Sequence, residues 1–338
     1  MTAENANSMI MPQLFSGPQT NTFLSDSPAA YRVWREHKLK CRQSLDPTMP
    51  VTLDRQQLFD QHGLRQARAH IAAFGFVLFD GASDLSKQGF LALNRQLGLN
   101  TIDANLSADS DAVTTLRVVD AQAKSSRYIP FTNRALNWHT DGYYNSPETM
   151  IRAFSLYCVQ PAISGGETSL LDHEMVYLAL RDMNYAWVEA LMDAQVMTIP
   201  ANVIDGETVR SEQSGPVFAI AEGVERTENE GAERSEKADR DNQAPQLTMR
   251  YTSRPGNIVW KAGASIQPAL AAIRDLLDNN EYTVKLRLLA GQGVICRNIL
   301  HRREAFDQNV AQSPRLFYRA RYLDSLAGSL TDSVGSKV

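Results

Sequence analysis

The sequence predicts a mixed α/β fold with a mainly β core. Many short runs rich in β-branched and aromatic residues are separated by Gly- and Pro-bearing turns, which is typical of strands. Between them lie stretches with apolar residues at helical spacing. With 338 residues and 43% hydrophobic content, the chain can bury a substantial core. No internal repeat is present, so we expect sheets flanked by helices.

In the first half of the chain, helices and strands are expected in mixed order. Residues 1–24 are polar and contain Pro12 and Pro18, as in a loosely held arm, and Ser27-Pro28 is a helix start. The expected helices cover 28–40, 55–73, 86–98, the stretch after Asp172 and 185–192; the expected strands cover 75–81, 113–120, 152–159 and 167–171.

The second half contains a segment of different composition at 222–244. It has almost no large apolar residue, which predicts a mobile loop, with a lid over the site as the alternative. Further strands are expected near 247–260, 282–286, 293–301 and 315–322, and a helix at 265–279. In the last strand all arginines fall on odd positions, so a period of two puts them on one face.

The overall charge argues against several classes of partner. A net charge of −4 gives no basic surface for nucleic acid or anionic membranes. No apolar stretch approaches the roughly 20 residues that span a bilayer, and we see no signal peptide. Three scattered cysteines indicate a reducing compartment. We therefore expect a cytoplasmic protein with a small-molecule substrate, and leave a homo-oligomer open.

The stretch from Asn137 to Asn145 carries the first chemical signal. His139 and Asp141 are two residues apart, so on an extended strand both side chains share a face. With His301, at the end of an apolar strand, they would complete a 2-His-1-carboxylate set for non-haem Fe(II). Each residue alone is more often a solvated turn residue or a packed histidine. As a set, they leave adjacent positions open for a 2-oxo acid and O2.

A 2-oxo acid with a second carboxylate would need a cation at its far end. A guanidinium can bind that carboxylate through two hydrogen bonds, and Arg315 follows His301 by fourteen residues. Arg319 has the same facing, and the hydroxyl of Thr168 could also donate. An outward, salt-bridged face remains the alternative for the arginines.

Four motifs in this order resemble the taurine dioxygenase-like (TauD/TfdA) family of Fe(II)/2-oxoglutarate-dependent oxygenases. They are His139-Thr140-Asp141-Gly142, Gly165-Gly166-Glu167-Thr168, the run 297–301 that ends at His301, and the run 315–320. The resemblance extends from about residue 75 to 322. It implies a double-stranded β-helix (jelly roll) flanked by helices. We expect it as a single domain over 51–325, after an arm and helix at 1–50 and before a flexible tail at 326–338.

The resemblance also implies roles for individual residues. His139, Asp141 and His301 would bind Fe(II), while Thr168 and Arg315 would bind the far carboxylate of 2-oxoglutarate. Arg319 would lie near the metal-side carboxylate or an acid group of the substrate. The loop between His301 and Arg315 is a few residues longer than is usual in the family, so the roles of the two arginines stay open. Asp141 in place of a small residue favours hydroxylation over halogenation, with release of succinate and CO2; desaturation remains an alternative.

The substrate pocket is expected around Tyr143, Tyr144, Asn145 and Arg134. Aromatic rings suit a cationic amine and arginines suit an acid, so we expect an amino acid, betaine or organic acid. Simple packing of the tyrosines is an equally good interpretation. The competing functions are a non-catalytic jelly-roll protein that binds or senses a metal or ligand, and a zinc hydrolase. Succinate release coupled to oxygen uptake distinguishes the oxygenase from both.

Overall fold

The computed structural model describes most of the chain. The described residues are 22–24, 27–81, 84–103, 109, 111–120, 122, 128–221, 245–254, 256, 258–307 and 314–326. The predicted loop at 222–244, most of the predicted arm and nearly all of the predicted tail lie outside them. In this described part, no helix is long and apolar enough to cross a membrane.

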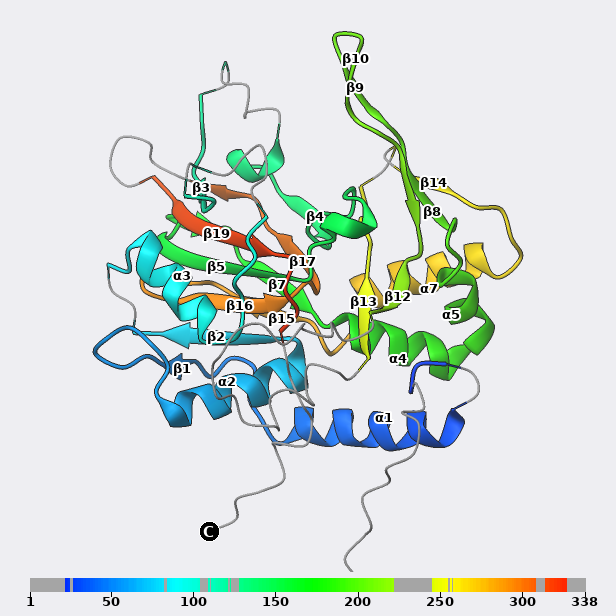
Figure 1. Cartoon of the computed structure of the whole chain (residues 1–338), viewed down its shortest axis with the longest axis horizontal. Helices are drawn as coiled ribbons and strands as arrows, with labels where there is room; N and C mark the ends of the chain where they lie inside the picture. Colours follow the sequence, from blue (N-terminus) through cyan, green and yellow to red (C-terminus); the bar gives the residue numbers. More distant parts are fainter. Residues whose placement is uncertain are drawn as a thin grey trace, which may run out of the picture.

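Two β-sheets form the centre of the molecule (Figure 1). The six-stranded sheet has the order β1 (Val51–Thr52), β2 (Phe76–Asp80), β16 (Gly293–Arg297), β5 (Ala153–Gln160), β19 (Leu316–Tyr322), β3 (Thr114–Leu116). The four-stranded sheet has the order β15 (Val284–Leu286), β7 (Thr168–Leu171), β17 (Leu300–Arg303), β4 (Leu136–His139). One buried cluster joins Phe154 and Phe317 of the first sheet to Leu170 and Leu286 of the second, so the sheets face each other. The predicted mixed, sheet-based fold is confirmed.

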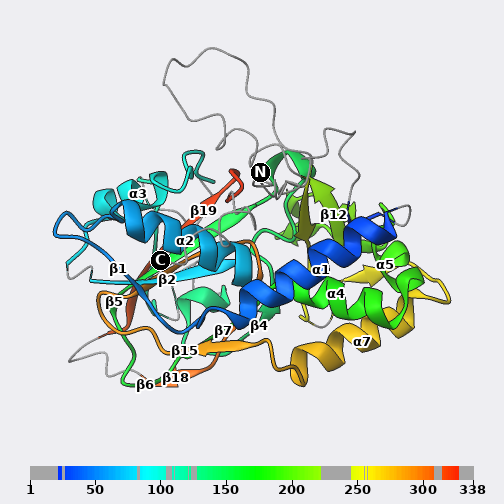
Figure 2. The same ribbon diagram turned by 90° about the horizontal axis from the view of Figure 1, so that it is seen from below.

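Helices cover the outer side of the six-stranded sheet and one end of the molecule (Figures 1 and 2). Helices α2 (Gln61–Phe74) and α3 (Lys87–Arg95) share a buried cluster with that sheet. Helices α4 (His173–Met183), α5 (Tyr185–Leu191) and α7 (Ile266–Asp278) enclose a second cluster, and α1 (Pro28–Gln43) runs beside α2 and α4. The remaining elements are η2 (Ile129–Phe131), η3 (Pro147–Thr149), β6 (Ser164–Gly165), β8 (Met197–Ile199), β9 (Asn202–Ile204), β10 (Glu207–Arg210), β11 (Gln213–Gly215), β12 (Phe218–Ala221), β13 (Gln246–Met249), β14 (Val259–Trp260) and β18 (Phe306–Asp307).

Helix α2 begins later than the sequence predicts. The sequence predicts a start at residue 55, but Asp60 caps the helix by accepting a hydrogen bond from the Gly63 amide at 2.7 Å. The preceding residues form a turn in which the Asp54 carboxylate accepts from the amides of Gln56 and Leu58. The helix ends at Gly75, whose φ of 76° suits a residue without a side chain.

The predicted arm is docked at its last described residues. Phe23 is 4% exposed and packs edge-to-face on Trp34 and Tyr177. Arg181 donates hydrogen bonds to the carbonyls of Thr22 and Leu24. For residues 22–24 the expectation of a loose segment is therefore wrong, because the Phe23 ring packs in an apolar pocket between α1 and α4.

Strand β19 presents its arginines to the space between the sheets. Phe317 belongs to the cluster between the two sheets, whereas Ala320 and Tyr322 belong to the cluster beneath α2 and α3. Odd positions therefore point inward, and Arg319 and Arg321 point inward with them. This is the shared face that the spacing predicts.

A buried ionic network ties α1 to the sheet. Lys38, whose side chain is fully buried, lies 2.7 Å from Asp172 and 2.5 Å from Glu174. Glu174 also pairs with Arg297 of β16 at 3.0 Å. Burial alone would raise the pKa of Asp172, but the charge of Lys38 holds this pKa well below its usual range.

Lys38→Ala is expected to lower the free energy of unfolding by about 3–5 kcal/mol, because it removes the nearest cation from two buried carboxylates and leaves Glu174 with Arg297 alone and Asp172 with only Arg42 at 3.9 Å. The matched control is Arg35→Ala, since Arg35 pairs with Asp182 where both side chains are 36% exposed. That change should cost about 0–1 kcal/mol. Urea denaturation measures both, and equal losses would contradict a stabilising role for the buried network.

Candidate metal centre

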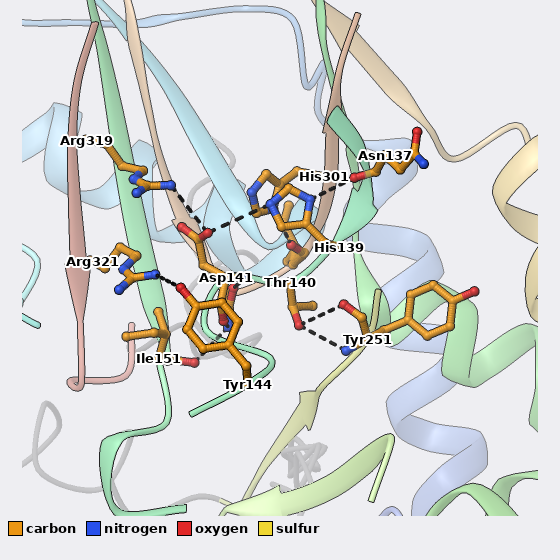
Figure 3. Close-up of polar contacts among 12 residues, drawn as sticks. Asn137, His139, Thr140, Asp141, Tyr144, Ile151, Tyr251, His301, Arg319 and Arg321 are labelled. Atoms are coloured by element: carbon orange, nitrogen blue, oxygen red, sulfur yellow. Dashed lines mark hydrogen bonds and ion pairs between the residues drawn. The ribbon is translucent and has the colours of Figure 1, made fainter. Parts of the chain in front are cut away.

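The structure brings the three predicted ligands together on and just beyond the neighbouring strands β4 and β17 of the four-stranded sheet (Figure 3). His139 ends β4 and pairs directly with His301 of β17, and their ring centroids are 4.2 Å apart. Asp141 follows just beyond the end of β4. One ligand atom from each residue lies within 4.8 Å of the others, and all three residues are buried. No other cluster of this kind is found among the residues that the structure describes.

Both imidazoles are oriented through their Nδ1 atoms. The Nδ1 of His139 is 2.8 Å from the carbonyl of Asn137, and that of His301 is 3.0 Å from the carbonyl of Ile299. A carbonyl can only accept, so each Nδ1 carries the proton and each Nε2 keeps its lone pair. Burial, with repulsion from His301, lowers the pKa of His139 to about 3, and burial also lowers the pKa of His301. Both rings are therefore neutral near pH 7, the form that binds metals.

Asp141 completes a donor set that fits divalent iron. Its Oδ1 lies 3.9 Å from the Nε2 of His139 and 3.6 Å from Arg319, while its buried Oδ2 has no hydrogen-bond partner among the described residues. Burial alone would raise the pKa of this carboxyl, but Arg319 and Arg321 hold it well below its usual range. Two neutral imidazoles and an ionised carboxylate with a free oxygen are the ligands that iron takes in a facial triad.

A second region of the site combines Arg315 with Thr168. These residues line one small cavity together with Gly165, Gly166 and Phe317. Burial, together with the nearby positive charge of Arg303, lowers the pKa of Arg315 to about 9. In the described part of the chain no carboxylate forms an ion pair with Arg315, and its Nε is buried without a partner. An unpaired buried cation is costly, so this cavity suits an anion.

On the side of Asp141 away from the two histidines, Arg319, Arg321 and Tyr144 lie close together (Figure 3). Arg321 contacts the carboxylate of Asp103 and donates to the hydroxyl of Tyr144 at 3.3 Å. The guanidinium of Arg210 lies 5.8 Å from the Tyr144 ring. The sequence predicts no role for Arg321 or Asp103 in the site. The odd position of Arg321 was the only signal for it, and nothing marked Asp103.

The other predicted pocket residues are engaged elsewhere. Tyr143 packs on the cluster around α4 and α7, and its carbonyl accepts from Arg250 at 2.6 Å. The side-chain amide of Asn145 donates to the carbonyl of Thr149 at 2.8 Å. Arg134 is exposed, and its carbonyl accepts from Arg303. Of the four, Tyr144 is the residue that contacts the charged groups beside Asp141.

Comparison with known proteins places the chain in a family. The model of the taurine catabolism dioxygenase TauD, TfdA family matches residues 40–321. A uridine-5'-phosphate dioxygenase from a Streptomyces species is 30% identical over 220 residues, which cover 62% of this chain and 70% of the relative. A uridine-5'-phosphate dioxygenase from an Amycolatopsis species is 25% identical over 194 residues, covering 56% of this chain and 61% of the relative.

A solved structure shows the same fold. AAD-2 in complex with Mn(II) and N-oxalylglycine aligns with a TM-score of 0.50 at 14% identity, over 82% of this chain and 94% of that one. The family match covers most of the present chain, including all three residues of the buried His-Asp-His cluster. The chain therefore belongs to the taurine catabolism dioxygenase TauD, TfdA family and is an Fe(II)- and 2-oxoglutarate-dependent dioxygenase.

Proposed function

We propose that His139, Asp141 and His301 bind Fe(II), and that the enzyme hydroxylates a small polar metabolite with an acidic group. The convergence of three buried ligand atoms within 4.8 Å carries this assignment. The free Oδ2 of Asp141 and the two carbonyl-bound Nδ1 atoms support it, since they leave one donor atom of each residue free. Unlike a non-catalytic binding protein, such an enzyme consumes O2 and 2-oxoglutarate.

Bound iron supplies the reaction of O2 with 2-oxoglutarate, in which one oxygen atom ends in succinate, CO2 is released and the other oxygen atom hydroxylates the substrate. The protein orients the reactants. Arg315 and Thr168 would bind the far carboxylate of 2-oxoglutarate, with its keto acid end toward the histidines. The shared cavity of these two residues favours Arg315 over Arg319 for this role.

The positive charges of Arg319 and Arg321 are an argument that the substrate carries an acidic group. Among the described residues, Asp141 is the one carboxylate that pairs with Arg319. If Asp141 also binds iron, Arg319 shares this carboxylate with the metal ion. An anion from the substrate would restore the balance of charge. The two relatives named for uridine 5'-phosphate make a nucleotide phosphate one candidate beside organic acids and amino acids. Succinate release measured with each class of compound separates these candidates, and identification of the oxidised product separates hydroxylation from desaturation.

We also propose that the facing sheets form a jelly roll. Eight strands support this: β3, β5, β16 and β19 in one sheet and β4, β7, β15 and β17 in the other. Along the chain they pass repeatedly between the sheets, as in a jelly roll of two Greek keys.

The test of the iron and co-substrate assignment is an anaerobic titration of the Fe(II)-loaded protein with 2-oxoglutarate. A chelated keto acid gives a visible charge-transfer band, which should appear in the wild-type protein and be absent from Asp141→Ala. Iron that is bound without any band would show that the 2-oxo acid does not chelate it, and would overturn the proposal.

A further inference from the structure

The side chain of Asn298 connects the two segments that carry the proposed ligands. Asn298 lies between β16 and β17, three residues before His301, and is 9% exposed. Its Oδ1 accepts a hydrogen bond from the Asp141 amide at 2.8 Å. Its Nδ2 donates to the carbonyls of Asp141 and Ile151, both at 2.8 Å. Both amide protons and the amide oxygen of this side chain are therefore used.

Asp141 needs such a partner because it lies outside the regular sheet. Strand β4 ends at His139, and the next residue pairs through its backbone with Tyr251. At Gly142 the chain turns with a φ of 63°. A buried amide or carbonyl without a hydrogen-bond partner destabilises the fold. The Asn298 amide supplies both partners at the point where no strand neighbour does.

The other end of this connection is held firmly. The amide of Asn298 donates to the carbonyl of Arg152, and the amide of Arg297 donates to the carbonyl of Gly75. His301 itself pairs with Leu170 on one side and His139 on the other. Asn298 therefore belongs to a segment with a fixed backbone. Its side-chain hydrogen bonds hold the Asp141 peptide in a fixed position relative to this segment.

We propose that Asn298 is a positioning residue that sets where the Asp141 carboxylate lies relative to His301 and so tunes the affinity for Fe(II). This inference rests on the proposed function of the three ligands. A small displacement of one ligand weakens a metal site because the donor atoms must meet at one point. A role in stability alone would instead lower the melting temperature and leave the metal affinity unchanged.

The chain offers a matched control in Asn94. This residue is fully buried, and its side chain donates to the carbonyl of Phe90 within α3, on the outer side of the six-stranded sheet. Asn94→Ala also removes a buried amide, so it should lower the melting temperature. It should not change the affinity for Fe(II).

Anaerobic calorimetry with Fe(II) on the wild-type and variant proteins is the test. Asn298→Ala should weaken Fe(II) binding by about 10–100-fold, the usual effect of removing a group that orients a ligand. The charge-transfer band with 2-oxoglutarate should also shift or broaden at saturating iron. If Asn298→Ala does not fold, Asn298→Ser is measured instead. Its hydroxyl preserves part of the polar pairing but cannot bind both the amide and the carbonyl of Asp141 as the Asn298 side chain does, so Fe(II) binding should again be weaker than in the wild-type protein.

The outcomes separate the two levels of inference. Wild-type protein that binds no Fe(II) would overturn the proposed function. Wild-type protein that binds Fe(II), with a folded Asn298 variant of the same affinity, would overturn the positioning role alone. An equal loss of Fe(II) affinity in Asn94→Ala would show that the loss is a general effect of lower stability. That result would also overturn the positioning role.

Discussion

Asp141→Ala is expected to abolish succinate release while the protein remains folded. The substitution removes the proposed anionic ligand and leaves Arg319 without its carboxylate partner among the described residues. Loss of an outer partner of a ligand already costs about 10–100-fold in metal affinity, so loss of the ligand itself should cost at least on the order of 100-fold. Anaerobic Fe(II) binding and oxygen-coupled succinate release measure the effect.

The control for this experiment is Asp182→Ala. Asp182 is also a carboxylate paired with an arginine, but it is partly exposed and lies on α4. Its removal should leave iron binding and turnover intact. Circular dichroism of the Asp141→Ala protein establishes that it is folded, and turnover retained in a folded Asp141→Ala variant would disprove the ligand assignment.

Arg315→Ala is expected to weaken the binding of 2-oxoglutarate far more than Arg319→Ala does. Removing one partner of a buried, hydrogen-bonded charge pair costs about 2–5 kcal/mol, which corresponds to roughly 30-fold to a few thousandfold in Kd. The Kd follows from titrating the charge-transfer band of the Fe(II)-loaded variants. Arg319→Ala should instead affect the KM for the substrate.

Arg315→Lys serves as the conservative control. Lysine keeps the charge but not the two parallel N–H donors, so it should recover only part of the affinity. A larger loss in Arg319→Ala than in Arg315→Ala would exchange the roles of the two arginines. Full affinity in Arg315→Lys would mean that the charge alone matters.

Much of the fold could be predicted from local pattern. Strands β2, β5, β7, β16 and β19 and helices α1, α4 and α7 lie where apolar periodicity and caps indicate them. These signals are local, because side-chain spacing and capping depend on neighbours in the chain. The predicted start of α2 is wrong because Asp60, and not an earlier residue, caps this helix. The docking of Phe23 could not be predicted, since its pocket comes from α1 and α4.

The sequence by itself determined the ligand types, the resemblance to a family and the shared face of the β19 arginines. Only the tertiary structure decided which groups meet. It paired His139 with His301 across two strands, put Arg315 beside Thr168 and Arg319 beside Asp141, and brought Asn298 to the Asp141 peptide. The physical reason is sequence separation: these contacts join residues from different strands and loops, and spacing along the chain specifies facing but not the partner across a sheet.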